Sequence, residues 1–225
     1  MKTIILGPPG TGKTTTLLNL VDQFIQQGIR PRQIGYFSFT RKAAREAATR
    51  AAEKFGLDAD EDLENFKTLH AFAFRRLAMT KEKMMTPEDY KEFGKMVGIP
   101  IKTGKHSEDD GTFNSDNEYL TIMNTARVKR MDLLEYYDSR QNILDIGLKD
   151  FTDLLEDFIA QENKPNFEAL FIDEAQDLSL IQWEMVRSMW ANANKTYIAG
   201  DDDQAIFKWA GADVDHFIAL KEEVN

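Results

Sequence analysis

The stretch 3-TIILGPPGTGKT-14 decides the fold of this chain. Its first four residues are an apolar run that ends at Gly7, which is typical of a buried parallel strand. The segment 7-GPPGTGKT-14 follows directly and leads into apolar residues at helical spacing, so a helix is expected over about residues 13–27. A glycine, four residues and then Gly-Lys-Thr, placed between a strand and a helix, form the phosphate-binding P-loop pattern. The sequence therefore predicts an α/β domain that binds a nucleoside triphosphate.

The residue types in this loop suit the chemistry of a bound phosphate. Glycines at positions 10 and 12 allow a tight turn in which successive N–H groups point at phosphate oxygens, at the positive end of the helix. Lys13 is expected to reach the β- and γ-phosphates, and the Thr14 hydroxyl is expected to ligate Mg²⁺. The predicted nucleotide-binding residues are Gly10, Thr11, Gly12, Lys13, Thr14 and Thr15.

A second motif, 170-LFIDEAQD-177, carries an apolar strand to two adjacent carboxylates. Parallel sheets bind their ligands at the carboxyl ends of the strands. We expect Asp173 to hold Mg²⁺ through water, and Glu174 to orient and deprotonate the water that attacks the phosphate. The alternative is a pair of solvated surface carboxylates, which the apolar run before them does not favour.

The rest of the chain divides into an α/β domain, residues 1–79 and 146–225, and a mostly helical insertion, residues 80–145. Within the domain, strands are expected at 34–40, 169–173 and 196–200, helices at 41–55, 151–160 and 180–191, and a further strand and helix within 66–77. Inside the insertion, the polar stretch 103–118 is expected to be a loop. Side chains expected to pack in the interior are Met79, Met84, Met85, Trp183 and Trp190.

Composition and charge exclude several kinds of protein. The net charge of −10 argues against a generally basic nucleic-acid coat, although positive charge gathers in residues 41–50, 75–76 and 127–130. Taken alone, each of these clusters is best interpreted as a solvated helix face. No apolar run approaches the roughly 20 residues of a membrane span. The absence of cysteine and of a basic, apolar leader leads us to expect a cytoplasmic protein without disulfides.

The P-loop alone does not select an enzyme family, because it is also frequent in AAA+ ATPases. Lys13 and Asp173 are 160 residues apart (173 − 13), a wider spacing than the AAA+ pattern has. The ordered set of motifs closely resembles the superfamily 1 DNA helicases of the UvrD/Rep/PcrA type, from about Ile4 to Phe217 apart from the insertion. These motifs are GPPGTGKT, 37-FSFTRKAARE-46, 68-TLHAFAFRRL-77, 150-DFTDLL-155, FIDEAQD and 200-GDDDQAIFKWAGA-212.

The resemblance implies a RecA-like ATP-binding domain that uses ATP and Mg²⁺ and moves on single-stranded DNA. Gln204 is similar to the family's glutamine that senses the γ-phosphate, so the catalytic set would be Lys13, Glu174 and Gln204. Trp209 with Phe207 resembles the platform on which DNA bases stack. The other implied DNA contacts are Phe39, Thr40, Thr68 and His70.

Some of these residues have a structural alternative. Phe39 alternates with Phe37 along a predicted strand, so one of the two is expected in the core. His70 is alternatively a core histidine, and Trp209 a packing residue. Two family residues have no counterpart here: only six residues precede Gly7, where the family has an adenine-reading glutamine, and Ala210 stands where an arginine is usual.

The family's second RecA-like domain, which supplies arginines to the ATP site, would begin where this sequence ends at Asn225. An arginine finger contributes on the order of 10³–10⁵ in rate. We therefore expect the 225 residues alone to bind nucleotide weakly, to hydrolyse ATP poorly and not to unwind duplex DNA. The alternatives are a nucleotide-dependent DNA-binding module without motor activity and a P-loop ATPase that acts on proteins or small molecules.

Overall fold

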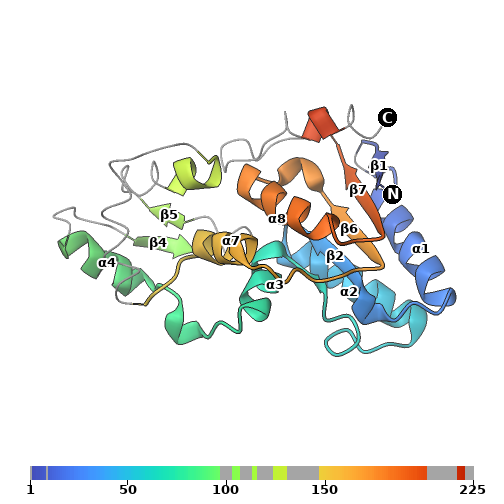
Figure 1. The fold of residues 1–225 in the computed structure, drawn as a ribbon, viewed down its shortest axis with the longest axis horizontal. Coiled ribbons are helices and arrows are strands. Elements are labelled where there is room, and N and C mark those ends of the chain that lie inside the picture. The colour runs from blue at the N-terminus through green and yellow to red at the C-terminus, as the bar shows by residue number, and fades with distance from the viewer. Residues whose placement is uncertain are drawn as a thin grey trace.

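A five-stranded parallel sheet forms the centre of the chain, with helices on both of its faces (Figure 1). The computed structural model describes residues 2–8, 10–96, 103–106, 113–115, 124–130, 147–201 and 217–220. The sheet order is β1-β7-β6-β2-β3, with bounds Lys2–Leu6 (β1), Lys195–Gly200 (β7), Ala169–Asp173 (β6), Ile34–Ser38 (β2) and Phe66–Lys67 (β3). The predicted RecA-like α/β fold class is therefore confirmed.

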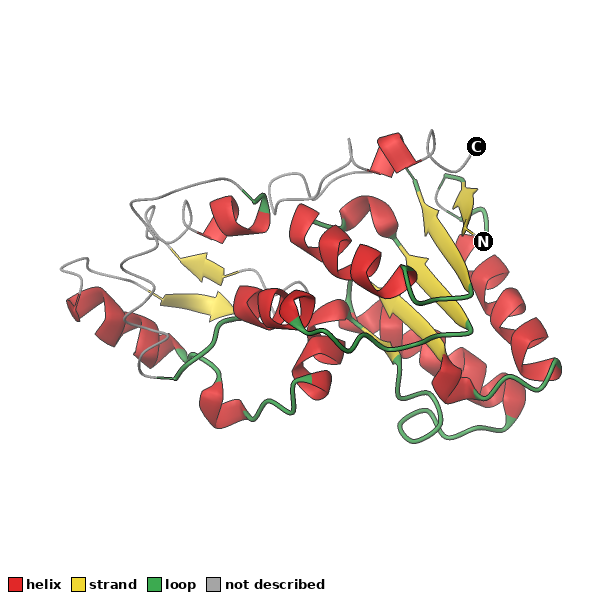
Figure 2. Ribbon diagram, in the orientation of Figure 1, coloured by secondary structure: helices red, strands yellow, loops and turns green. Residues whose placement is uncertain are grey.

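One face of the sheet is covered by α1 (Lys13–Gln26) and α2 (Arg41–Phe55), as Figure 2 shows. In α1 the buried side chains recur at helical spacing, whereas α2 presents alanines, which let the helix lie close to the strands. The Thr40 side chain accepts a hydrogen bond from the Ala43 amide at 3.1 Å, and Gly56 ends α2 with a positive φ of 64°. These two caps explain why this helix has the bounds that the sequence predicts.

The other face is covered by α3 (Leu69–Arg76), α7 (Phe151–Ala160) and α8 (Leu180–Trp190). Trp183 is fully buried in the core on this face, and Trp190, Met79 and Met84 pack against that core. Met85 is also buried, with 6% of its surface exposed. The packing roles predicted for these residues are confirmed. Short 3₁₀ turns lie at Pro31–Gln33 (η1), Lys81–Lys83 (η2) and Ala175–Asp177 (η3).

The insertion contains strands that the sequence did not predict. Helix α4 (Pro87–Met96) and a helical turn at residues 124–128 agree with a helical region. However, β4 (Thr103–His106) pairs antiparallel with β5 (Phe113–Ser115), so the predicted loop over 103–118 is wrong for these two segments. Antiparallel pairing depends on backbone hydrogen bonds, which polar residues make as readily as apolar ones.

The sheet order determines where the predicted site lies. Both β1, which leads into the P-loop, and β6, which ends at Asp173, are neighbours of β7. All three strands run in the same direction, so their carboxyl ends meet at one edge of the sheet. None of the helices in the described ranges has the length and apolar composition required to cross a bilayer.

Candidate nucleotide site

The P-loop bends through two glycines with a left-handed backbone, Gly10 at φ 73° and Gly12 at φ 82°. Other residues rarely adopt this conformation, so these positions require glycine. Lys13 begins α1 and is buried, and its Nζ donates to the backbone oxygens of Gly7 at 2.6 Å and Pro8 at 3.3 Å. The ammonium group is thus held inside its own loop, where phosphate oxygens could replace the two carbonyls as acceptors.

The neighbouring threonines have different surroundings. Thr11 is exposed and donates to the Pro8 oxygen at 2.7 Å, which closes the turn. Thr15 is exposed in the first turn of α1. Thr14 is half-buried, and its hydroxyl donates to Asp173 Oδ2 at 2.9 Å. This bond joins the P-loop to the end of β6.

The donor set around this bond fits Mg²⁺. Because the Thr14 hydroxyl gives its proton to Asp173, the lone pairs of its oxygen remain able to face a cation. Hydroxyl, carboxylate, water and phosphate oxygens are the ligands that Mg²⁺ takes. Thr14 would hold the ion directly and Asp173 through water, and the bound ion would neutralise charge on the phosphates.

Asp173 is held by three donors. Its Oδ2 also accepts from the Tyr36 hydroxyl at 2.7 Å, and its Oδ1 accepts from the Glu174 amide at 3.1 Å. Burial raises the pKa of Asp173, while the donors Tyr36 and Thr14 oppose that rise. Burial, together with the charge of Asp173, raises the pKa of Tyr36 well above its usual value, so Tyr36 keeps its proton and remains a donor.

Glu174 has a strained backbone at the edge of the site. Its φ of 53° is left-handed, a conformation that costs a non-glycine residue of order 1–3 kcal/mol. Such strain is concentrated at functional positions. The Glu174 carboxylate is half-buried and accepts a hydrogen bond from Gln176 Nε2 at 2.9 Å. The turn therefore places this carboxylate beside Asp173, at the carboxyl edge of the sheet.

Gln176 connects Glu174 to the end of β7, the strand that lies between β1 and β6 in the sheet. The Gln176 side chain is buried, and its Oε1 accepts from the Asp201 amide, just beyond β7, at 3.0 Å. A Cβ on Gly200 would lie 2.9 Å from this oxygen and 2.5 Å from Phe217, so only glycine fits there. Gln176 has no role predicted from the sequence, because its contact to Asp201 depends on the pairing of β6 with β7. The predicted γ-phosphate sensor, Gln204, lies outside the described residues.

Asp177 also accepts a hydrogen bond from Gln176. Its raised pKa predicts that the free energy of unfolding of the chain depends on pH. Burial and the Glu174 charge raise the pKa of Asp177 to about 7. Between the ordinary value of 3.8 and about 7, the folded chain binds more protons than the unfolded chain, so stability falls as the pH rises through this window. We expect Asp177→Asn to stabilise the Mg²⁺-free protein at pH 8, on the order of 2 kcal/mol, and to change little at pH 4.

Chemical denaturation at a series of pH values measures this effect. Asp157→Asn is the matched control, because that carboxylate is 38% exposed and forms an ion pair with Lys149. Parallel stability curves for wild type and Asp177→Asn would show that Asp177 has an ordinary pKa.

The predicted DNA contacts that lie within the described residues fall into two groups. Thr68 and His70 both line a cavity of about 460 Å³ between α3 and α7. Cationic side chains surround it: Arg41, Lys67, Arg75 and Lys81. The His70 ring meets the Phe151 ring edge-on at 5.9 Å.

The second group consists of Phe39 and Thr40, which do not line this cavity. Thr68 of the first group is a helix cap like Thr40: it is 3% exposed, and its hydroxyl accepts from the Ala71 amide at 3.3 Å. Phe39 is 7% exposed and lies in the same core cluster as Phe37. The Thr40 hydroxyl caps α2. Their DNA contacts stay predictions, as do those of Phe207 and Trp209, which lie outside the described residues.

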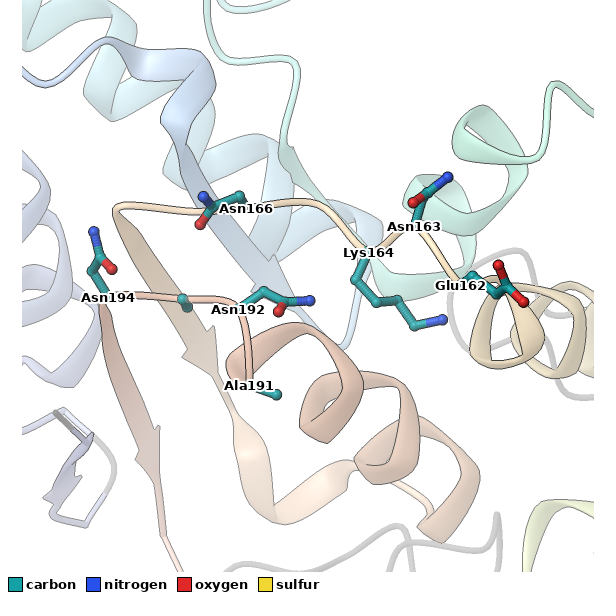
Figure 3. Close-up of a pocket in the computed structure, with 8 residues that line it drawn as sticks. Glu162, Asn163, Lys164, Asn166, Ala191, Asn192 and Asn194 are labelled. Atoms are coloured by element: carbon teal, nitrogen blue, oxygen red, sulfur yellow. The ribbon is translucent and has the colours of Figure 1, made fainter.

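Another hollow, of about 490 Å³, lies at the opposite edge of the sheet, between the loops before β6 and β7 (Figure 3). Lys164 points toward the end of α7, where its Nζ donates to the backbone oxygens of Phe158 at 2.8 Å, Ile159 at 3.0 Å and Gln161. An ammonium group has three protons to donate, and all three have carbonyl partners here. This lysine therefore stabilises the end of α7.

The sequence matches a family of AAA domains over residues 1–210. It is 25% identical over 244 residues to the ATP-dependent DNA helicase Rep of Buchnera aphidicola, covering 98% of this chain and 36% of that protein. It is 27% identical over 256 residues to a probable DNA helicase of Mycoplasma pneumoniae (98% and 47%) and 25% identical over 240 residues to DNA helicase II of Escherichia coli (95% and 33%).

These relatives agree with the resemblance found in the sequence. The matched region is the N-terminal part of the relatives, and the chain spans about a third to a half of their length. The P-loop, the Thr14–Asp173 bond and the parallel sheet are the features of a P-loop nucleotide site. The chain therefore belongs to the AAA domain family and resembles the N-terminal ATP-binding domain of the UvrD/Rep type of DNA helicase.

Proposed function

We propose that this chain is the ATP-binding part of an ATP-dependent DNA helicase or translocase, which couples Mg·ATP hydrolysis to movement on single-stranded DNA. The observation that carries the proposal is the Thr14–Asp173 hydrogen bond of 2.9 Å, with Glu174 next in the chain. This bond joins the phosphate loop to the end of β6, although the two are far apart in sequence, and so supports Thr14 and Asp173 as the magnesium ligands and Glu174 as the base. The helicase relatives supply the DNA substrate of the proposal.

In this proposal each residue acts on a defined atom. Lys13 binds the β- and γ-phosphates in place of its loop carbonyls, and Glu174 takes the proton of the attacking water. Gln204 senses the γ-phosphate. Gln176 donates to the Glu174 carboxylate and accepts from the Asp201 amide. A movement of Glu174 can therefore change the position of Asp201, at the start of the motif that contains Gln204.

Single-stranded DNA is proposed to cross the cavity that Thr68 and His70 line. Its cationic surroundings suit a phosphate backbone, in spite of the overall charge of −10. His70 and Phe74 offer rings in the same cavity, and Phe207 with Trp209 would add a stacking platform. Affinity for DNA should fall with rising salt, by about 0.7 in log K per log salt for each phosphate contacted.

We further propose that a polypeptide of these 225 residues hydrolyses ATP slowly and does not unwind DNA. The support is length: the chain matches 36% of its Rep relative. The test is steady-state ATP hydrolysis with and without oligo-dT, with Lys13→Ala as the blank. Slow turnover that DNA stimulates supports the proposal. Nucleotide binding with a turnover that DNA does not change would reject the proposed coupling of ATP hydrolysis to DNA. Unwinding of duplex DNA by the purified monomer would reject the proposal that these residues alone do not unwind DNA.

Replacing the proposed stacking residue gives a separate prediction. Trp209→Ala should weaken binding of oligo-dT by about 1–3 kcal/mol, roughly 5- to 150-fold, because the base that stacks on this ring loses its stacking surface. Trp209→Phe is the matched control, since it keeps an aromatic face and should retain most of the affinity. Fluorescence anisotropy with labelled oligo-dT measures both variants. An unchanged affinity in Trp209→Ala would mean that this residue does not stack on DNA.

A further inference from the structure

A row of aromatic rings crosses the sheet below the P-loop, with one ring from each of four neighbouring strands. The Tyr36 ring (β2) stacks on the Phe66 ring (β3), with 5.2 Å between the ring centroids. The centroid of Tyr36 is also 6.2 Å from that of Phe171 (β6), and the Phe171 ring stacks on Tyr197 (β7) with 5.1 Å between centroids. Tyr36 is fully buried and Tyr197 nearly so. The row therefore holds the Tyr36 ring in one orientation, and its hydroxyl has a fixed position.

The Tyr36 hydroxyl ends at the carboxylate of Asp173. It donates to Oδ2 at 2.7 Å, the oxygen that also accepts from Thr14 at 2.9 Å. The Glu174 amide donates to Oδ1 at 3.1 Å. A carboxylate has about four lone-pair sites, so the three donors leave about one for a further partner. Asp173 is 2% exposed, and the loss of one donor would leave its carboxylate both under-bonded and freer to rotate.

We propose that Tyr36 is a positioning residue for the magnesium site: its hydrogen bond orients the Asp173 carboxylate toward Thr14 of the P-loop. This inference rests on the proposed nucleotide function. Partners that orient a metal-binding group typically change metal affinity 10- to 100-fold when they are removed. The role requires the hydroxyl and not the ring, so it can be separated from packing.

The test compares two tyrosines of the same row. Tyr36→Phe removes the hydroxyl that donates to Asp173. Tyr197→Phe removes a hydroxyl from the same aromatic row, on the side of Phe171 that is away from Tyr36, and serves as the control. The main measurement is the Mg²⁺ concentration that gives half-maximal binding of a fluorescent ATP analogue. The affinity for the analogue in EDTA and the melting temperature of the free protein are measured for the same variants. We expect Tyr36→Phe to raise the required Mg²⁺ about tenfold. Its affinity for the analogue in EDTA should stay within about twofold of wild type, and Tyr197→Phe should change neither value.

Each result has one meaning. An unchanged Mg²⁺ requirement in Tyr36→Phe would overturn the inference and leave the nucleotide site intact. An equal loss of affinity with and without Mg²⁺ would also overturn it, because that pattern indicates general damage. If folded wild-type protein bound no nucleotide, the proposed function would fail first, and the inference with it.

A second pair of variants keeps the test valid if Tyr36→Phe folds poorly. 4-Aminophenylalanine and 4-methylphenylalanine at position 36 match the size of tyrosine with and without a donor. We expect the amino variant to remain near wild type and the methyl variant to require about ten times more Mg²⁺. Equal requirements in the two variants would overturn the inference.

Discussion

Glu174→Gln is expected to lower ATP turnover about 10²- to 10⁴-fold while nucleotide binding is retained. The amide that replaces the carboxylate can still orient a water but cannot take its proton. The left-handed backbone at Glu174 is kept, because glutamine has the same length and the same backbone requirements. Release of labelled phosphate over hours measures the change, with Lys13→Ala as the blank.

The control for this prediction is Glu184→Gln, which removes a carboxylate that is 36% exposed on α8 and pairs with Arg130. It should leave turnover and binding as in wild type. Wild-type turnover in Glu174→Gln would contradict the assignment of Glu174 as the base. Loss of binding together with turnover would assign Glu174 to the nucleotide or metal site instead.

Arg127→Met is expected to destabilise the folded chain by about 3–5 kcal/mol. The guanidinium is 7% exposed and donates to Asp153 at 2.8 Å, to Glu156 at 3.1 Å and to Asp150. Asp150 and Asp153 also cap the start of α7, each bonding the backbone amide of the other. Removing the cation takes away the ion-pair partner that Asp150 and Asp153 share at the start of this helix, whereas Glu156 keeps its ion pair with Arg130.

Arg130→Met is the matched control, because that side chain is 31% exposed and pairs with Glu156 and Glu184. Exposed ion pairs contribute about 0–1 kcal/mol. Chemical denaturation of the two variants at pH 7 measures the difference. If Arg127→Met costs no more than Arg130→Met, the buried ion pairs of Arg127 contribute no more to stability than the more exposed pairs of Arg130.

The central sheet could be predicted from the sequence because its strands are continuous apolar runs. Segments such as 3-TIIL-6 and 169-ALFID-173 have few alternatives once a P-loop follows the first of them. The α2 helix was predicted with its observed bounds, since Thr40 and Gly56 mark its ends. In contrast, β4 and β5 lie in a polar stretch without such signals, and the sequence favoured a loop.

Contacts between distant segments could not be predicted. Tyr36 is one of several aromatic residues in an apolar strand, and its bond to Asp173 follows only from the pairing of β2 with β6. Arg127 was interpreted as part of a solvated helix face, whereas the structure buries it against carboxylates about 23 residues or more away in sequence. Both cases require the register of elements, which local patterns do not contain.

Equilibrium binding of Mg·ATP to wild type and to Lys13→Ala tests the central claim most directly. Both proteins would be titrated with the fluorescent analogue after circular dichroism has shown that they are equally folded. We predict saturable, Mg²⁺-dependent binding to wild type and at least about tenfold weaker binding to Lys13→Ala, because charge-assisted hydrogen bonds to phosphate are lost. Equal affinities, or no saturable binding to folded wild type, would contradict a nucleotide site at this loop.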